Sequence, residues 1–139
     1  MAELQIDHEQ LPRIAEEFGL RFIALFGSAA KGRMTGESDL DLAVWADPLP
    51  ESDDERAEWR MGLDAALSRA VPHGGGVDVV VLNRVRSLLQ FEVARYGVVL
   101  HERTAGAWSR FKSYAARRYD DDAPFRERVH EYLMRAYAP

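Results

Sequence analysis

The stretch FGSAAKGRMTGESDLDLAV, residues 26–44, decides how the rest of the chain is interpreted. It begins with Gly27 and Ser28 at the end of an apolar segment, and ten residues later come Asp39 and Asp41. The apolar alternation around the two aspartates predicts a strand. Side chains two positions apart on a strand point to the same face, so we expect these carboxylates to lie side by side, with Cα atoms about 6–7 Å apart.

A third carboxylate, Asp78, lies inside the apolar segment 77–82, which also has the composition of a strand. Neighbouring carboxylates repel each other, and a lone charge in an apolar strand needs a partner. If this strand lies beside the one that carries Asp39 and Asp41, the three carboxylates meet. Oxygen ligands of this kind suit Mg²⁺ or Mn²⁺, and three acids can hold two such ions for in-line phosphoryl chemistry.

The Gly27-Ser28 pair supplies features that bind a phosphate. Glycine lets an anion approach the backbone, and the N–H groups at the start of a following helical turn attract negative charge. The Ser28 hydroxyl can donate another hydrogen bond, and Lys31 or Arg33 can add positive charge. One site could therefore hold a triphosphate at one end and metal ions at the other.

Each element of this pattern also has a simpler interpretation. A Gly-Ser pair is usually a turn, and an Asp-x-Asp pair often lies on a solvated edge strand. Asp78 could be an acid at a strand end that binds the backbone, and Lys31 and Arg33 could simply face solvent. The functional interpretation is favoured by the combination of these elements in the order and spacing that the chain shows.

The rest of the chain alternates helical and extended patterns. Strands are predicted over about 20–26, 40–45, 77–82 and 98–101, and helices over about 8–18, 55–71 and 87–96. From about 104 to 138 the pattern is helical and divides near 120–124. This order predicts an α/β (α+β) fold, with a small mixed β-sheet flanked by helices and a helical C-terminus.

Composition narrows the function classes. The 139 residues fit one domain, 1–139, and the net charge of −5 opposes a general nucleic-acid binder, which needs a basic face. The chain has no cysteine, which excludes disulfides, thiolate zinc sites and a thiol nucleophile. The N-terminus does not resemble a signal peptide, and no apolar stretch reaches bilayer length. We therefore expect a cytoplasmic protein with no membrane contact.

Gly27-Ser28, the ten-residue gap and Asp39-x-Asp41 resemble the signature of the nucleotidyltransferase superfamily that includes DNA polymerase β. The run Ser38-Asp39-Leu40-Asp41-Leu42 resembles the minimal nucleotidyltransferases (MNT) in particular. Lys31 stands where many relatives carry arginine. The resemblance covers a core of about 5–102 and leaves a helical C-terminal extension of about 103–139.

The resemblance implies a polymerase-β-like fold and a Mg²⁺-dependent reaction. Asp39 and Asp41 resemble the ligands of two Mg²⁺ ions, which Mn²⁺ can replace, and Asp78 resembles the third ligand, which also helps to deprotonate the acceptor. Gly27 and Ser28, with Lys31, resemble the residues that bind the nucleotide triphosphate. The implied reaction is the transfer of AMP from ATP to a hydroxyl, with pyrophosphate leaving.

Small MNT proteins similar to this one are typically paired with a HEPN-domain RNase toxin. The resemblance therefore implies an antitoxin in a toxin–antitoxin pair, which adenylylates a tyrosine of the HEPN toxin and forms a hetero-oligomer with it. No direct contact with nucleic acid is expected. A protein acceptor would explain why the chain has no substrate domain of its own.

Some alternatives remain open. The chain could be a small-molecule nucleotidyltransferase, such as one that modifies an antibiotic, or a non-catalytic antitoxin that acts by binding. The acidic charge and short length oppose a template-directed polymerase. The aromatic stripes of the C-terminal segment, one around Trp108 and Phe111 and one around Phe125 and Tyr132, could pack on the chain's own sheet or dock the partner.

Overall fold

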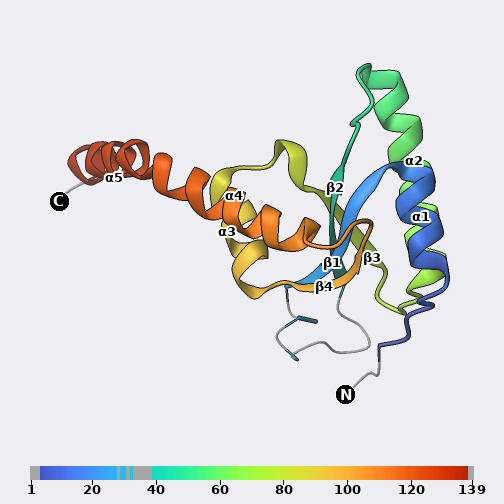
Figure 1. Cartoon of the computed structure of the whole chain (residues 1–139). Coiled ribbons are helices and arrows are strands. Elements are labelled where there is room, and N and C mark those ends of the chain that lie inside the picture. Colours follow the sequence, from blue (N-terminus) through green and yellow to red (C-terminus); the bar gives the residue numbers. More distant parts are fainter. Residues whose placement is uncertain (1–3, 28, 31, 33–38, 138–139) are drawn as a thin grey trace.

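The computed structural model describes residues 4–27, 29–30, 32 and 39–137, and Figure 1 shows how their elements are arranged. The strands are β1 (Leu20–Phe26), β2 (Leu40–Ala46), β3 (Val77–Val81) and β4 (Val98–Glu102). The helices are α1 (Gln10–Phe18), α2 (Asp53–Ala70), the 3-10 turn η1 (Leu82–Arg84), α3 (Ser87–Tyr96), α4 (Ala107–Asp121) and α5 (Ala123–Tyr137). The predicted α+β order is confirmed, with boundaries that coincide or differ by at most three residues.

The four strands form one mixed sheet in the order β3-β2-β1-β4. The central strands β1 and β2 are antiparallel, β4 is antiparallel to β1, and β3 is parallel to β2. The strand that carries Asp78 therefore does lie beside the strand that carries Asp41, as the proposed meeting of the carboxylates required. Because β3 is an edge strand, one of its sides is open.

The alternation of β2 separates two hydrophobic cores, one on each face of the sheet. Leu40, Leu42 and Val44 are buried against α1 and α2, which cover one face. Ala43 points to the other face, where it joins residues of α3 and α4. Because neighbouring strand positions face opposite ways, Asp41 lies on the same side as Ala43. The carboxylates therefore share a face with α3 and α4.

Glycine sets the boundary between the first helix and the first strand. Gly19 adopts a left-handed conformation with φ 67°, and its N–H reaches the carbonyl of Glu16 at 3.4 Å, which closes α1. Its own carbonyl accepts from Asp47 N at 2.7 Å, beside the end of β2. One residue thus ends the helix and fixes the start of β1 against β2.

The two C-terminal helices have different environments. α4 buries Trp108, Phe111 and Ala115 against the sheet, where both aromatic rings lie within 5.1 Å of the Phe22 ring centroid. α5 contacts α4, extends away from the sheet in Figure 1, and has no buried residue. None of the described helices is long and apolar enough to cross a membrane.

Candidate active site

Two aspartates meet at the end of the sheet where β1 finishes and β2 and β3 begin. Asp41 and Asp78 are Cα partners in the parallel β2–β3 ladder, so their side chains project from the same face of neighbouring strands. On its other side Asp41 pairs with Phe26, the last residue of β1. Gly27 follows Phe26 directly, which brings the glycine of the Gly-Ser pair to the same end of the sheet.

The pKa of Asp41 reflects its burial and the nearby negative charges. Partial burial, followed by the negative charges of Asp78 and Asp39, raises the pKa of the Asp41 carboxyl above its ordinary value of 3.8. Within the described part of the chain, no arginine or lysine forms an ion pair with any of these three carboxylates. Asp41 is therefore the centre of an uncompensated negative cluster, the arrangement that a bound cation would relieve.

Gly27 and Asp41 are packed together so closely that the glycine has no substitute. Gly27 has φ +72°, which disfavours any residue with a side chain. A Cβ at this position would also collide with Oδ2 of Asp41. The sequence predicted that Gly27 makes room for a phosphate. In the structure, the space that a side chain would fill is occupied by the Asp41 carboxylate. The binding of a phosphate by Gly27 stays a prediction.

The carboxylates at this end of the sheet are ligands of the type that Mg²⁺ binds. Magnesium prefers oxygen ligands and usually takes one or two protein carboxylates, with the rest from water and phosphates. Among the described residues, no three acidic or histidine side chains already form a group that could hold a metal ion. The chemistry of Asp41 and Asp78, together with the raised pKa of Asp41, nevertheless fits a site that is completed by the phosphates of a substrate.

The other predicted site residues lie in different environments. Asp39 is described, is exposed, and contributes to the raised pKa of Asp41. Ser28 and Lys31, predicted to bind the triphosphate, lie outside the described residues, as does Arg33. Asp78 is exposed rather than enclosed in an apolar strand. Burial therefore does not by itself require a partner for its charge, and the role of Asp78 as a metal ligand stays a prediction.

A cavity of 610 Å³ runs along the open edge of β3 and includes Asp78 in its lining. Arg56, Arg60 and Arg84 also line it, and Arg60 donates to the backbone carbonyl of Val79. No pattern in the sequence placed these arginines near Asp78, since two come from α2 and one from η1. Two of the three, Arg56 and Arg60, form ion pairs with acids of α2, so much of the positive charge at this edge is compensated.

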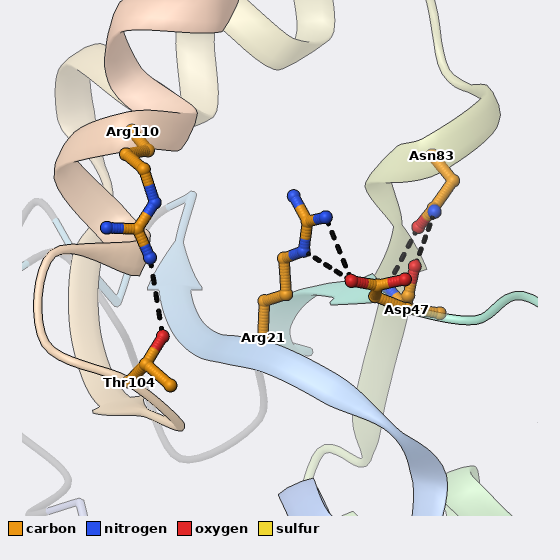
Figure 2. A network of polar contacts seen from close by, with 6 residues as sticks. Arg21, Asp47, Asn83, Thr104 and Arg110 are labelled. Atoms are coloured by element: carbon orange, nitrogen blue, oxygen red, sulfur yellow. Dashed lines mark hydrogen bonds and ion pairs between the residues drawn. The ribbon is translucent and has the colours of Figure 1, made fainter.

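The opposite end of the sheet carries a polar network with a structural role (Figure 2). Asn83 accepts from Ala46 N at 2.9 Å and donates to Ala46 O at 2.8 Å, which ties η1 to the end of β2. Arg21 pairs with Asp47 at 2.8 Å, and Arg110 donates to the Thr104 hydroxyl at 3.3 Å. These contacts fix the strand ends that lie opposite the carboxylates.

Comparison with known proteins gives one family and a consistent set of folds. A family model described as "Polymerase beta, Nucleotidyltransferase" matches residues 9–105. A search of curated proteins gives no match. Among solved structures, a toxin–antitoxin complex with AMP-PNP is 24% identical with a TM-score of 0.69, and covers 93% of this chain and 99% of that chain.

Two further structures show the same architecture. A mutant form of the MntA-HpeT toxin–antitoxin with a single tyrosine-to-alanine substitution is 25% identical with a TM-score of 0.66, covering 94% of this chain and 99% of that chain. A complex of a tri-AMPylated HEPN toxin with its MNT antitoxin, from Shewanella oneidensis, is 22% identical with a TM-score of 0.63, covering 92% and 96%. The predicted polymerase-β-like fold and the resemblance to MNT antitoxins are confirmed.

Proposed function

The chain belongs to the polymerase beta nucleotidyltransferase family, and we propose that it is an antitoxin that transfers AMP from ATP to a tyrosine of a HEPN toxin. The observation that carries the proposal is the position of Asp41. It pairs with Asp78 across the β2–β3 ladder and is packed against Gly27, and burial together with the charges of Asp78 and Asp39 raises its pKa, with no cationic partner among the described residues. A protein gains nothing in stability from such a cluster, so its value lies in binding.

In the reaction, the tyrosine oxygen attacks the α-phosphorus of ATP. The bond from that phosphorus to the pyrophosphate oxygen breaks, pyrophosphate leaves, and the hydroxyl proton is lost. Asp78 is exposed on an edge strand, so an acceptor on another chain can reach its carboxylate, which helps to remove the proton. Arg84, which lines the neighbouring cavity, adds positive charge that attracts the negatively charged reactants toward this edge.

Asp39, Asp41 and Asp78 are the residues that would hold two Mg²⁺ ions. When bound, the ions supply charge neutralisation for the triphosphate and for the leaving pyrophosphate. The three carboxylates would hold these ions at the end of the sheet where β3 leaves an open edge. Gly27 keeps the backbone clear beside Asp41, and Ser28 and Lys31 are proposed to bind the β- and γ-phosphates.

The partner is inferred from the relatives. The solved structures that share this fold include complexes of MNT antitoxins with HEPN toxins, and one of those toxins carries AMP. A separate chain as acceptor agrees with the exposed position of Asp78. Since the reaction consumes ATP, we assign it to the cytoplasm.

The proposal is tested by incubating the protein and its co-expressed HEPN partner with Mg²⁺ and ATP labelled at the α-phosphate. We expect label on the partner, at a tyrosine, and none with the double variant Asp39→Asn, Asp41→Asn. Glu58→Gln, an exposed acid on α2, is the matched control and keeps full transfer.

The same experiment separates the alternatives. Label that appears on a small molecule when the partner is left out would assign the chain to small-molecule nucleotidyltransferases. A partner that is silenced equally well by the double aspartate variant would show that binding alone neutralises it. Either result overturns the proposed reaction.

A further inference from the structure

The last helix, α5, exposes an apolar stripe that the chain itself does not cover. Phe125, Val129, Tyr132, Leu133 and Tyr137 follow helical spacing along one face. Phe125 is 61% exposed, Tyr132 70% and Tyr137 81%. A helix of this length is marginally stable alone, and soluble proteins rarely leave so much contiguous apolar surface without a partner.

The stripe continues into a groove between α3, α4 and α5, with a volume of 650 Å³. Its apolar floor consists of Leu88 of α3 with Phe125, Val129 and Leu133 of α5. This groove is separate from the carboxylate edge of the sheet, because none of the aspartates of that edge lines it. Its shape suits an amphipathic helix, which places alternate turns into such a groove.

The start of α5 is held in place by a stack of three side chains. The rings of Phe91 and Tyr119 are parallel to within 13°, with centroids 4.2 Å apart. The Arg126 guanidinium lies 3.6 Å from the Tyr119 ring centroid, and its Nη1 donates to Tyr119 O at 2.6 Å. The stack joins α3, α4 and α5, so the groove is formed before any partner binds, which lowers the entropic cost of docking.

The rim of the groove is basic. Arg86, Arg118 and Arg126 line it against a single acid, Asp122. Arg118 and Arg126 donate to backbone carbonyls, and within the described ranges no carboxylate forms an ion pair with any of the three arginines. The groove therefore presents uncompensated positive charge around an apolar floor.

This charge selects among the possible occupants. A second copy of α5 would bring Arg126, Arg128 and Arg135 against the basic rim, with only Glu127 and Glu131 to offset them. Like charges across an interface oppose association. A helix with apolar residues on one face and acidic residues beside them satisfies both the floor and the rim.

We infer that the groove between α3, α4 and α5 docks an acidic amphipathic helix of the partner protein. The identity of that partner as a HEPN toxin rests on the proposed function, whereas the chemistry of the docking helix rests on the groove alone. Docking there holds the partner by a surface that is distinct from the carboxylates that modify it.

The test measures the binding of labelled helical peptides to the full-length protein by fluorescence anisotropy. The probes are about 18 residues long, or about five helical turns. One carries leucine on a single face with glutamate elsewhere, the second has lysine in place of glutamate, and the third is a scrambled Leu/Glu sequence with no apolar face. We expect the Leu/Glu helix to bind at least about tenfold more tightly than the other two.

Two variants locate the binding. The double change Phe125→Ser, Leu133→Ser is expected to weaken binding of the Leu/Glu helix at least about tenfold, because it removes the apolar floor. Arg86→Glu should reduce the ratio of the affinity for the Leu/Glu helix to the affinity for the Leu/Lys helix, because it places a negative charge on the rim. Met61→Ser, which removes an exposed apolar side chain on α2, is the matched control and should change nothing.

Absence of binding by the Leu/Glu helix, or equal binding of the scrambled peptide, would overturn the inference. So would light scattering that shows a dimer which Leu133→Ser converts to a monomer, because a second copy would then be the occupant. None of these readouts depends on AMP transfer, so a failure of docking and a failure of the proposed reaction are distinguishable.

Discussion

The carboxylate edge of the sheet and the helix α5 each expose groups without a partner among the described residues. At the edge these groups are negative charges, and on α5 they are apolar side chains. At the edge, partial burial and then the negative charges of Asp78 and Asp39 raise the pKa of Asp41. On α5, large apolar side chains face solvent, and no residue is buried. Among the described residues, no cationic side chain pairs with the carboxylates of the first region, and no apolar surface covers the exposed side chains of the second.

The two regions differ in the kind of molecule that each can bind. A compact cluster of carboxylates is balanced by small ions and the phosphates that accompany them. An apolar stripe along a 15-residue helix is balanced only by another macromolecule. We therefore expect substitutions at the carboxylate edge to lower the rate of AMP transfer and substitutions on α5 to weaken partner binding, each with little effect on the other property.

The largest effect is expected from Asp41→Asn. The rate of AMP transfer to the partner should fall by at least about 10³-fold, since the interactions of a catalytic metal are worth several kcal/mol. Partner binding, measured by co-elution, should be unchanged. A variant that retains more than a tenth of the wild-type rate would contradict the placement of Asp41 at the reacting centre.

The two C-terminal helices should differ in how much a substitution lowers the free energy of unfolding. Phe111→Ala on α4 removes a ring that is 5% exposed, and should lower the free energy of unfolding by about 3–5 kcal/mol. Tyr132→Ala on α5 should change it by less than about 0.5 kcal/mol, because that side chain is 70% exposed. Urea unfolding measures both. Equal destabilisation by the two variants would show that α5 is packed against the body of the protein.

A smaller effect is expected at the glycine beside Asp41. Gly27→Ala should cost about 1–3 kcal/mol, because it adds strain at φ +72° and displaces the Asp41 carboxylate. Gly76→Ala is a control with φ +92° and no atom within 4 Å of the added Cβ, so it carries strain alone. We expect only Gly27→Ala to slow AMP transfer as well. Equal losses of transfer in both would mean that Gly27 has no special relation to Asp41.

The smallest effect concerns the charge of Asp41 in the metal-free protein. A raised pKa means that the folded state holds the proton more tightly than the unfolded state, so this contribution to stability is lost as pH rises through the raised value. In EDTA, Asp41→Asn should therefore be more stable than wild type by a few tenths to about 1 kcal/mol near pH 7, a range that allows for solvent screening. The difference should vanish below the ordinary pKa of 3.8. Thermal melts across this range measure the difference, and a difference that stays constant with pH would show that folding does not raise the pKa of Asp41.

Much of the fold was predictable because it depends on local patterns. The alternation of Leu40, Leu42 and Val44 identified the buried face of β2, and Asp41 then had to lie on the other face with Ala43. The spacing of Asp39 and Asp41 likewise predicted that their charges would interact. These features depend on a few consecutive residues, and a sequence records such information directly.

The features that were missed depend on which segments become neighbours. The apolar run around Asp78 suggested a buried strand, and only the sheet order makes β3 an edge strand with an exposed carboxylate. The contact of Gly27 with Asp41 joins two strands across a loop. The stripes of α4 and α5 have the same spacing in the sequence. Only the position of α4 over Phe22 shows which stripe is buried.

Our main proposal is that the carboxylate edge transfers the adenylate and that the groove beside α5 holds the acceptor. Its most direct test is the intact mass of the co-expressed HEPN partner after incubation with ATP and Mg²⁺, for wild type, Asp41→Asn and the double change Phe125→Ser, Leu133→Ser. We predict adenylate added by wild type, none by Asp41→Asn although the partner stays bound, and slow addition by the α5 variant that recovers at high concentration. Adenylate added by Asp41→Asn as fast as by wild type would contradict the claim.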